Sequence, residues 1–376
     1  MIIRRAVVST GGTGGHIFPA LAVIEELRKR FPFIKILFLG GERGPEKEMA
    51  ERAGVEFVGL PARGVLGKGM RSLRTVSWLA RSIFRCLSIY RKFSPEVVIG
   101  FGSYAGFVPV LLATLKRIPS AVHEQNSKPG VTNKFLGSRV DRVFLSFPDD
   151  EGYFDAGKVM FTGNPVRSKF EEIRDKEKEY LGDTAGRLLV LGGSQGARAV
   201  NDAIIESLPA FKSGNIQIVH QAGEQDVDRV LRAYREQGMP EEVYVFVEDM
   251  AGLFEWADLV VSRSGASTVA ELTTAGRPSV LIPYPYAIQS HQLDNAKRLE
   301  EAGAAIVLEQ SYLQDINLAG VVMDLLAVPQ KLQEMGVRAK RLGSPGAARK
   351  IVDELVNVTE DRGQRTEVRK KTDDRR

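Results

Sequence analysis

The strongest constraint on the fold of this chain is that the same pattern of strand, glycine turn and helix opens each of its two halves. Residues 7–16 read VVSTGGTGGH, and residues 189–197 read LVLGGSQGA. Such a turn exposes backbone N–H groups at a helix N-terminus, where anionic groups are favoured. One loop alone is equally consistent with glycines that only permit a tight turn. The pair predicts two phosphate-binding turns that face each other across a cleft between domains.

Apolar, β-branched runs alternate with helix-period segments along most of the chain, which is typical of parallel sheets wound through helical crossovers. The predicted strands of the first half are Arg5–Ser9, Ile34–Gly40, Glu56–Leu60, Val97–Phe101, Ser120–His123 and Arg142–Phe147. Those of the second half are Arg187–Leu191, Ile216–His220, Val243–Val247, Leu259–Ser262, Ser279–Pro283 and Ala305–Leu308. We therefore predict an α/β protein with two Rossmann-like domains, which suits a length of 376 residues.

The domain boundary is predicted at Gly163-Asn164-Pro165, where a strand ends in turn-forming residues before the charged helical segment 169–179. The N-terminal domain then covers residues 1–163 and the C-terminal domain residues 164–343. Ser344 as N-cap and Pro345 as first helical residue predict a helix over 344–358 that can pack back on the first domain. Residues 359–376 have no periodic apolar face and are predicted to be disordered.

The composition, with 43% hydrophobic and 26% charged residues, is that of a globular protein. The lone cysteine, Cys86, excludes an internal disulfide, and the N-terminus lacks the pattern of a secretory signal, so we expect a cytoplasmic protein. The longest nearly apolar stretch, 106–115, is too short to cross a bilayer, and any membrane contact is expected to be peripheral. A net charge of +5 favours an anionic membrane or nucleic acid as partner.

Five motifs in the following order carry a family resemblance: GGTGGHIFPA at 11–20, HEQN at 123–126, GNPVR at 163–167, GGSQGA at 192–197 and RSGASTVAE at 263–271. They resemble the MurG family of bacterial N-acetylglucosaminyltransferases over nearly the whole chain before the tail. The resemblance implies a GT-B fold, with acceptor bound by the N-terminal domain and sugar nucleotide mainly by the C-terminal one. It also implies inversion at the anomeric carbon, with no cofactor and no required metal.

The resemblance further implies the substrates UDP-N-acetylglucosamine and undecaprenyl-pyrophosphoryl-MurNAc-pentapeptide, met at the cytoplasmic face of the inner membrane. The family's donor contacts fall on Thr13, Gly14, Gly15, Asn126, Arg167, Ser194, Met250 beside the uracil, Ala266, Ser267, Thr268, Val269, Ala270, Glu271, Gln292 and Asn295. The acceptor contacts fall on Tyr104, Glu124 and Asn126. The sugar-binding stretch at 289–295 matches the family less cleanly, and the role of His291 stays open.

Sugar transfer needs a base for the attacking hydroxyl and a site for the charge that gathers on the departing diphosphate. His16 stands at the mouth of the first helix, where the helix dipole favours a neutral imidazole that can accept a proton. The alternative role for His16 is to cap the turn. His123 and His220 each close an apolar strand, where a structural role is the commoner explanation.

The diphosphate charge is expected to meet the N–H groups of the glycine turns, Ser194, the Ser267-Thr268 segment and Arg167. Glu271, which can only accept hydrogen bonds, suits a ribose diol. No His, Cys, Asp or Glu cluster has metal-ligand spacing. Asp226 and Asp228 are predicted to lie on a solvated helical face, where residues two apart point in different directions.

Residues 57–95 contain no Asp or Glu but eight Lys and Arg, which predicts a basic helix. Arg74, Arg81, Arg85 and Lys92 share one face of that helix, and Val76, Leu79, Ile83, Leu87 and Tyr90 share the opposite one. Trp78 and Ile89 lie near the basic face and are expected to dip into lipid headgroups. The alternative is a solvated basic face.

Three other functions compete with this interpretation. Another GT-B glycosyltransferase would use a soluble acceptor. An oxidoreductase or epimerase would use Glu42 as a ribose-binding acid, but neither loop reads Gly-x-Gly-x-x-Gly and no phosphate-binding Gly-x-x-x-x-Gly-Lys motif occurs. A nucleic-acid-binding protein would need aromatic residues interleaved along a basic groove, and we expect no nucleic-acid partner.

Overall fold

The computed structural model describes residues 2–12, 14–42, 44–61, 73–180, 185–193, 196–287 and 291–373, and side chains within these ranges except those of 73–76 and 365–373. The chain forms two compact units, residues 1–167 with 346–376, and residues 168–345. The chain crosses between the units at 167/168 and at 345/346, compared with the expected 163/164 and 343/344.

The first unit is a seven-stranded parallel sheet in the order β3-β2-β1-β4-β5-β6-β7. Its elements are β1 (Arg5–Ser9), α1 (Gly14–Arg30), β2 (Lys35–Gly41), α2 (Glu46–Arg52), β3 (Glu56–Leu60), α3 (Leu73–Phe93), β4 (Val97–Gly100), α4 (Ser103–Leu115), β5 (Ser120–Glu124), α5 (Val131–Gly137), β6 (Arg142–Leu145), β7 (Val159–Phe161) and α14 (Ala347–Asp373).

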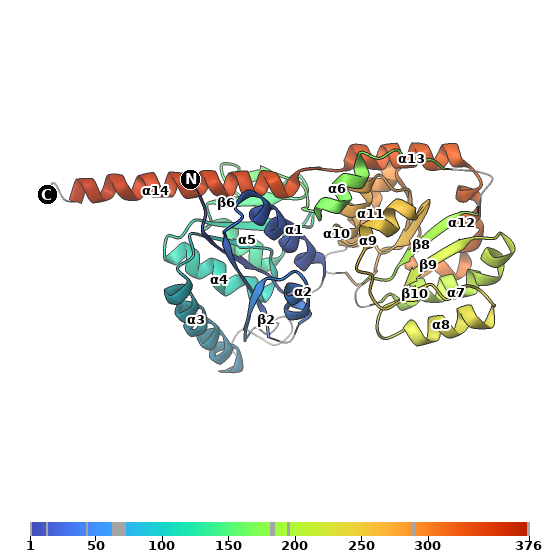
Figure 1. The fold of residues 1–376 in the computed structure, drawn as a ribbon, viewed down its shortest axis with the longest axis horizontal. Coiled ribbons are helices and arrows are strands. Elements are labelled where there is room, and N and C mark those ends of the chain that lie inside the picture. Colours follow the sequence, from blue (N-terminus) through green and yellow to red (C-terminus); the bar gives the residue numbers. More distant parts are fainter. Residues whose placement is uncertain are drawn as a thin grey trace. The chain divides into compact units, whose positions relative to one another are not determined.

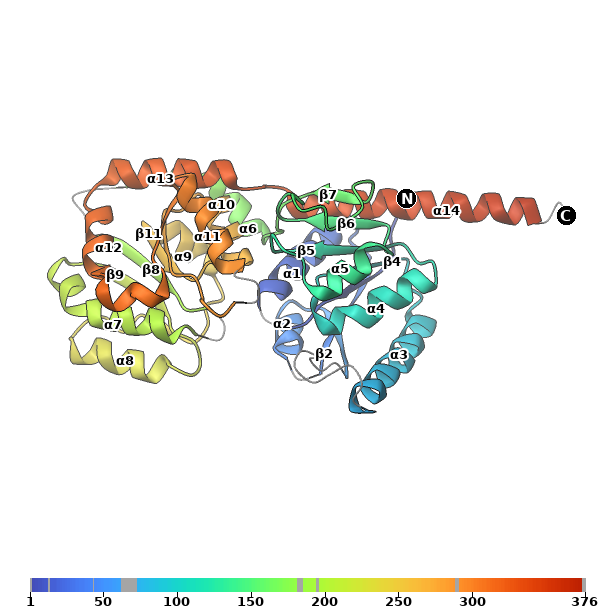
Figure 2. The same cartoon turned by 180° about the vertical axis from the view of Figure 1, so that it is seen from behind.

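Helices cover both faces of this sheet because alternate strand residues point to opposite sides and both sets are apolar. Val8 belongs to the core under α1 and α14, whereas its neighbour Val7 belongs to the core under α3, α4 and α5. In Figure 1 α1 is seen in front of the sheet, and Figure 2 shows α4 and α5 from the other side. Helices therefore cover both faces of the sheet, and a binding site is expected at the ends of its strands.

The second unit is a six-stranded parallel sheet in the order β10-β9-β8-β11-β12-β13. Its elements are α6 (Ser168–Arg174), β8 (Arg187–Leu191), α7 (Arg198–Ser213), β9 (Gln217–Gln221), α8 (Val227–Glu236), β10 (Val243–Tyr244), α9 (Met250–Trp256), β11 (Leu259–Ser262), α10 (Ala266–Ala275), β12 (Ser279–Leu281), α11 (His291–Glu301), β13 (Ala305–Val307), the 3-10 helix η2 (Gln310–Asp315), α12 (Leu318–Leu326) and α13 (Pro329–Leu342). One face packs against α7, α8, α12 and α13. Phe170 of α6 and Phe254 of α9 stack edge to face at 5.2 Å.

All twelve predicted strands are confirmed, with ends that shift by up to three residues. The prediction missed β7, a three-residue strand, and β10 keeps only Val243 and Tyr244 of its expected five residues. The charged helix expected over 169–179 was wrong in its second part, because α6 ends at Arg174.

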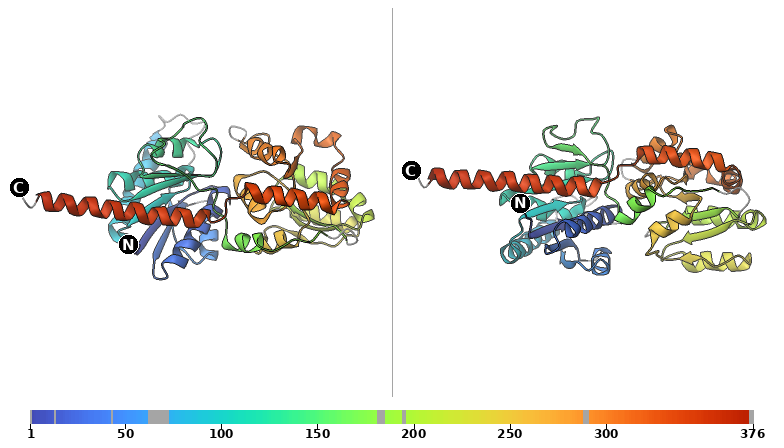
Figure 3. Two further views of the ribbon diagram at one scale, coloured as in Figure 1. Left: turned by 90° about the horizontal axis from the view of Figure 1, so that it is seen from above. Right: turned by 45° about the horizontal axis from the view of Figure 1, so that its top comes forward.

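The C-terminal helix differs from the prediction at both ends. It begins at Ala347, because Gly346 has a φ of +71°, a left-handed conformation that interrupts a helix after Ser344 and Pro345. Its residues Ile351 and Leu355 lie in the core of the first unit beside α1, and Figure 3 shows α14 lying lengthwise against that unit. The disorder expected from 359 was wrong for the first residues beyond it, because Arg362 pairs with Asp141 at 2.5 Å.

Candidate active site

The predicted residues of the first unit gather at the point where its sheet changes winding direction. The neighbours β1 and β4 lead into α1 and α4, on opposite faces of the sheet, and ligands of open α/β sheets bind beyond the carboxyl ends of strands at such a switch point. The first glycine turn and His16 follow β1, and Tyr104 follows β4. Asn126 follows β5, the next strand of the sheet.

His16 is half-buried between two glycines that have positive φ angles. A Cβ on Gly12 would lie 3.9 Å from the ring carbon Cδ2, and one on Gly102 would lie 3.5 Å from Cε1 and Nδ1. Nδ1 lies 3.0 Å from Oε1 of Gln125. The backbone is bent sharply here, because Ser103 adopts a φ of +66° that non-glycine residues rarely take, as backbones at functional sites do.

The first glycine turn differs from the expected free anion site. The N–H of Gly12 donates to Oε1 of Glu46 at 2.7 Å, and this carboxylate, 2% exposed, comes from α2. A negative side chain therefore already occupies one donor of the turn. Gly14 and Gly15 begin α1 as expected, and Thr13 lies outside the described residues.

Glu124 is buried and holds the loop after β5 in place, and its expected direct contact with an acceptor stays a prediction. One carboxylate oxygen accepts the backbone N–H and the Nδ2 of Asn126, and the other accepts the N–H of Gly130 and Nδ2 of Asn133. Glu124 is 2% exposed, and both of its carboxylate oxygens accept hydrogen bonds from this loop. Asn126 is half-buried and keeps its side-chain oxygen for a ligand.

Arg167, the last residue of the first unit, stands near the glycine turn. Its guanidinium lies over the ring of Phe18, in the second turn of α1, at 5.3 Å. This cation–π contact holds a positive charge beside the start of α1, as the expected diphosphate role requires.

The second unit repeats the arrangement, because β8 and β11 are neighbours at its switch point. The second glycine turn follows β8, with φ of +78° at Gly193 and +77° at Gly196. A Cβ on Gly196 would lie 2.7 Å from the carbonyl oxygen of Ala222, so only glycine fits. Ser194 lies outside the described residues.

Helix α10 follows β11 and directs its first backbone N–H groups at the same switch point. Gly265 is its N-cap, and the first turn contains no acidic residue. Ala266, Ser267, Val269 and Glu271 are buried, and Thr268 and Ala270 are half-buried. The side chain of Val269 is therefore out of reach of a ligand, which leaves its backbone for the expected contact. Met250 begins α9 and is also buried, beside the N-cap Asp249.

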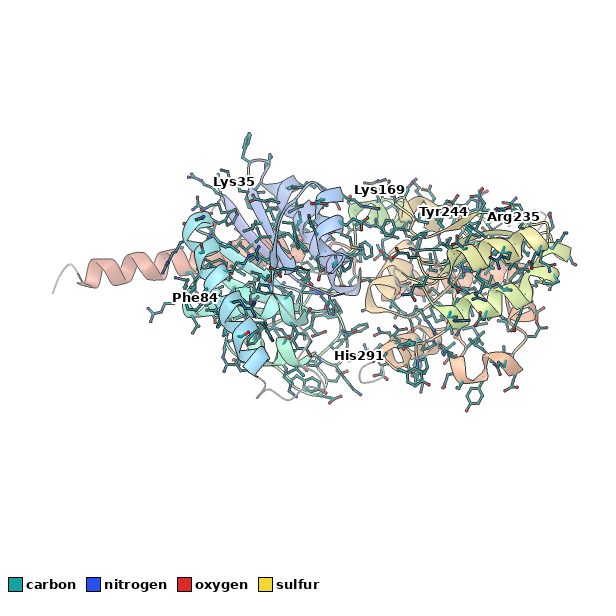
Figure 4. The ribbon with its side chains drawn as sticks, turned by 90° about the horizontal axis from the view of Figure 1, so that it is seen from below. Lys35, Phe84, Lys169, Arg235, Tyr244 and His291 are labelled. Atoms are coloured by element: carbon teal, nitrogen blue, oxygen red, sulfur yellow. The ribbon has the colours of Figure 1, made fainter. Side chains whose placement is uncertain are left out.

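Gln292 and Asn295 tie α11 to the loop after β11. The backbone oxygen of Gln292 accepts from the hydroxyl of Ser264 at 2.7 Å, and its Oε1 accepts from the N–H of Tyr284 at 3.0 Å. Asn295, 1% exposed, donates to the carbonyl oxygen of Ser264 at 3.2 Å. These bonds hold the two side chains in place at the start of α11, and their expected contacts with the sugar stay predictions. His291, labelled in Figure 4, begins α11 and is half-buried.

The remaining polar candidates are structural. Burial lowers the pKa of His123 to about 4, although its Nε2 donates to the oxygen of Gly163 at 3.2 Å, and burial lowers the pKa of His220 to about 3. Both agree with the expected structural roles. Asp226 is not on a solvated face, because it precedes α8 and pairs with Arg229 at 2.6 Å. Among the described residues no group of three His, Cys, Asp or Glu side chains could hold a metal ion.

Helix α3 has the predicted two faces, with two differences in its apolar residues. Ile83, Leu87 and Tyr90 face the core, but so does Ile89, so its expected insertion into lipid was wrong. Phe84, which the prediction missed, is 73% exposed and is labelled in Figure 4.

Two of the basic residues have partners. Arg85 pairs with Glu42 at 2.6 Å, which removes Glu42 as a ribose-binding acid, and Arg81 donates to Ser77 within its own helix. Lys92 is exposed and Trp78 half-buried, while the side chains of Arg74 and Val76 lie outside those described. Within the described ranges no helix is long and apolar enough to cross a membrane.

Comparison with known proteins places these features among sugar-nucleotide enzymes. Residues 6–145 match the Glycosyltransferase family 28 N-terminal domain, and residues 187–351 match the C-terminal domain of the same family. A relative from Nitratidesulfovibrio vulgaris (strain DSM 19637 / Miyazaki F) is 45% identical over 96% of this chain and 99% of its own. Its name is UDP-N-acetylglucosamine--N-acetylmuramyl-(pentapeptide) pyrophosphoryl-undecaprenol N-acetylglucosamine transferase.

Solved structures agree on the fold. The crystal structure of Acinetobacter baumannii MurG, 30% identical, matches with a TM-score of 0.71 over 94% of this chain and 99% of that one. The calicheamicin glycosyltransferase CalG4 and a UDP-N-acetylglucosamine 2-epimerase match with TM-scores of 0.65 and 0.61, over 95% and 94% of this chain and 99% and 96% of their own, at 17% and 15% identity. The two domains thus have the GT-B architecture, which by itself serves more than one reaction.

Proposed function

The chain belongs to glycosyltransferase family 28, and from that premise we propose that it transfers N-acetylglucosamine from UDP-N-acetylglucosamine to the 4-hydroxyl of lipid-linked N-acetylmuramyl-pentapeptide. This reaction converts lipid I into lipid II in peptidoglycan synthesis. The observation that carries the proposal is 45% identity, over nearly the full length of both chains, to a transferase whose name states these two substrates.

In the proposed reaction the 4-hydroxyl oxygen forms a bond to the anomeric carbon from the face opposite UDP. The bond between that carbon and the phosphate oxygen breaks, and its electron pair leaves with the diphosphate. The hydroxyl proton passes to Nε2 of His16. The charge on the diphosphate is met by the N–H groups at the start of α10 and by the second glycine turn, since a helix N-terminus favours an anion.

The test is transfer from radiolabelled UDP-N-acetylglucosamine to a lipid-linked muramyl-pentapeptide, in the presence of EDTA. We expect turnover to continue with EDTA, because backbone N–H groups take the place of a metal at the diphosphate. A soluble sugar acceptor without the muramyl-peptide serves as control. Transfer only to the soluble acceptor, or donor epimerisation without transfer, would contradict the proposal.

We expect Glu271→Ala to weaken UDP binding by about 10- to 100-fold, because a hydrogen bond to a charged group contributes roughly 1.5–3 kcal/mol. Its position on α10, one turn after Ser267, supports its assignment to the ribose hydroxyls. Isothermal calorimetry with UDP measures the effect, and Glu172→Ala, an exposed site on α6, is the matched control. Equal UDP affinities in the two variants would remove Glu271 from the donor site.

The exposed face of α3 is the proposed docking surface for an anionic membrane at the cytoplasmic side of the inner membrane. Arg81, Arg85 and Lys92 are exposed on it, together with Phe84, whereas Ile89 is half-buried against the core. Each cation near an anionic surface contributes about 1 kcal/mol, and Glu42 reduces the share of Arg85. The total attraction from these cations is of the size expected for reversible docking of an enzyme whose acceptor is a lipid.

Changing Arg81, Arg85 and Lys92 together to Glu is expected to abolish cosedimentation with phosphatidylglycerol vesicles, because attraction becomes repulsion. Binding of the parent should weaken as salt rises, since exposed charges are screened over about 8 Å at physiological ionic strength. A triple Glu variant at the exposed Arg235, Lys331 and Lys350 has the same net charge and should still cosediment. Equal cosedimentation of the two variants would disprove docking by α3.

A further inference from the structure

Gln125 lies in the interior of the first unit, directly after β5, and links two functional parts of the switch point. It is 1% exposed. Its Nε2 lies 3.2 Å from the carbonyl oxygen of Phe101, which follows β4, and its Oε1 lies 3.0 Å from Nδ1 of His16. Gln125 belongs to the HEQN motif at 123–126, and its position in the motif alone does not indicate a role.

The backbone determines which way the Gln125 amide points. A carbonyl oxygen only accepts hydrogen bonds, so the group that faces the oxygen of Phe101 must be the NH₂. The opposite orientation would place two acceptor oxygens against each other in a buried position, at the cost of an unsatisfied pair. The carboxamide oxygen of Gln125 is therefore the atom that faces His16.

The orientation of this amide in turn decides which nitrogen of His16 carries the proton. An amide oxygen is only an acceptor, so Nδ1 must be the donor across the 3.0 Å contact. In a neutral imidazole the other nitrogen, Nε2, then holds the lone pair. Neither Gly12 nor Gly102 has Nε2 as its nearest ring atom, and Nε2 has no hydrogen-bond partner among the described residues.

We propose that Gln125 is a positioning residue that fixes His16 in the tautomer with hydrogen on Nδ1, so that Nε2 is ready to accept the proton of the acceptor hydroxyl. The effect on the reaction rests on the proposed function, in which His16 is the base, but the effect on the tautomer does not. Because the orienting group is neutral, it sets the ring without bringing a negative charge to it. Two hydrogen bonds in sequence thus connect the carbonyl oxygen of Phe101, through the Gln125 amide, to the ring of His16.

The direct test is nitrogen-15 NMR of the protein labelled at its histidine imidazoles. The chain has four histidines, and His16→Ala identifies the signals of His16. Protonated and lone-pair nitrogens of a neutral imidazole resonate far apart, so the spectrum shows which nitrogen carries hydrogen. We expect hydrogen on Nδ1 of His16 in the parent and a mixture of tautomers in Gln125→Met, which keeps the side-chain length but loses both polar atoms.

Two further variants separate positioning from folding. Gln125→Glu keeps an acceptor for Nδ1–H and should retain the parent tautomer, although it loses the donor to the carbonyl oxygen of Phe101. Gln217→Met makes the same chemical change as Gln125→Met at an exposed site and should alter nothing. His123 is the internal reference, because its buried ring in the same unit should keep its signals in every variant that folds.

In the transfer reaction we expect Gln125→Met to lower kcat by about 10- to 100-fold. This loss is a part of the rate enhancement of about 10²–10⁴-fold that a general base supplies. The KM for the donor should stay nearly unchanged. Gln125→Glu, which keeps the acceptor for Nδ1–H but loses the donor to Phe101, should restore part of kcat. A Gln125→Met protein whose His16 keeps hydrogen on Nδ1 alone overturns the proposal, and so does a changed tautomer with unchanged kcat. If His16→Ala turns over normally, the proposed base fails, while the NMR result still decides what Gln125 does to the ring.

Discussion

Replacing His16 by alanine is expected to lower kcat by about 10²–10⁴-fold, the contribution of a positioned general base. Affinity for UDP should change little, because the proposed diphosphate donors at the start of α10 and in the second glycine turn stay unchanged. Initial rates with saturating acceptor and calorimetry with UDP separate the two effects. The glycines on either side of the ring leave room around it, so added imidazole should restore part of the activity.

The imidazole rescue has its own control, because the parent enzyme should gain nothing from added imidazole. A His16→Ala variant that retains more than about a third of the parental kcat would return His16 to the alternative role of capping the glycine turn. A large loss in both kcat and UDP affinity would instead indicate that the substitution disturbs the fold of the site.

Acidification from pH 6.5 to 4.5 is expected to remove about 2 kcal/mol of the unfolding free energy of the second unit through His220 alone. Burial lowers the pKa of His220 to about 3, compared with 6.5 for an ordinary histidine. Below pH 6.5 the unfolded chain therefore binds a proton that the folded one does not, and stability falls by about 1.4 kcal/mol per pH unit until the folded group titrates near pH 3.

The geometry explains why the folded state keeps this ring neutral. Nε2 of His220 lies 3.0 Å from Oδ1 of Asn201, and Nδ1 lies 3.3 Å from the hydroxyl of Tyr234. Because an amide oxygen only accepts, Nε2 carries the hydrogen and Nδ1 accepts from Tyr234. A second proton would place an unsolvated charge in the core, where the pull of Asp226 offsets only part of the cost.

Urea unfolding followed by tryptophan fluorescence measures this loss. The chain has two tryptophans, so Trp78→Phe leaves Trp256 of α9 as the reporter of the second unit. His220→Gln in that background should remove one proton from the pH slope between pH 6.5 and 4.5, whatever the carboxylates contribute. The His220→Gln protein is less stable at pH 7, so the slopes and not the absolute values are compared. Equal slopes with and without His220 would contradict the assignment.

The residue pattern alone located both glycine turns and every described strand except β7, because these features are local. A strand buried on both faces must be apolar along its length, and a turn that needs positive φ or close backbone approach must use glycine, as at Gly12 and Gly196. The missed strand β7 lies at the edge of its sheet, and its three residues are half-buried or exposed, so it lacks the buried residues that mark the other described strands. The structural assignment of His123 and His220 also followed from their place at the ends of apolar strands.

The tertiary structure decided which polar groups are available for chemistry, because their partners come from distant parts of the chain. Glu46 reaches the N–H of Gly12 from 34 residues away, and Gln125 reaches His16 from 109 residues away. In the same way Glu42 pairs with Arg85, although Arg85 lies in the stretch 57–95, which contains no Asp or Glu. The sequence by itself determined the two domains and their glycine turns, and it predicted His16 as the base. Packing decided that Glu124 and Asn295 are buried and that Nδ1 of His16 faces Gln125, since hydrogen-bond partners are set by proximity in the fold and not along the chain.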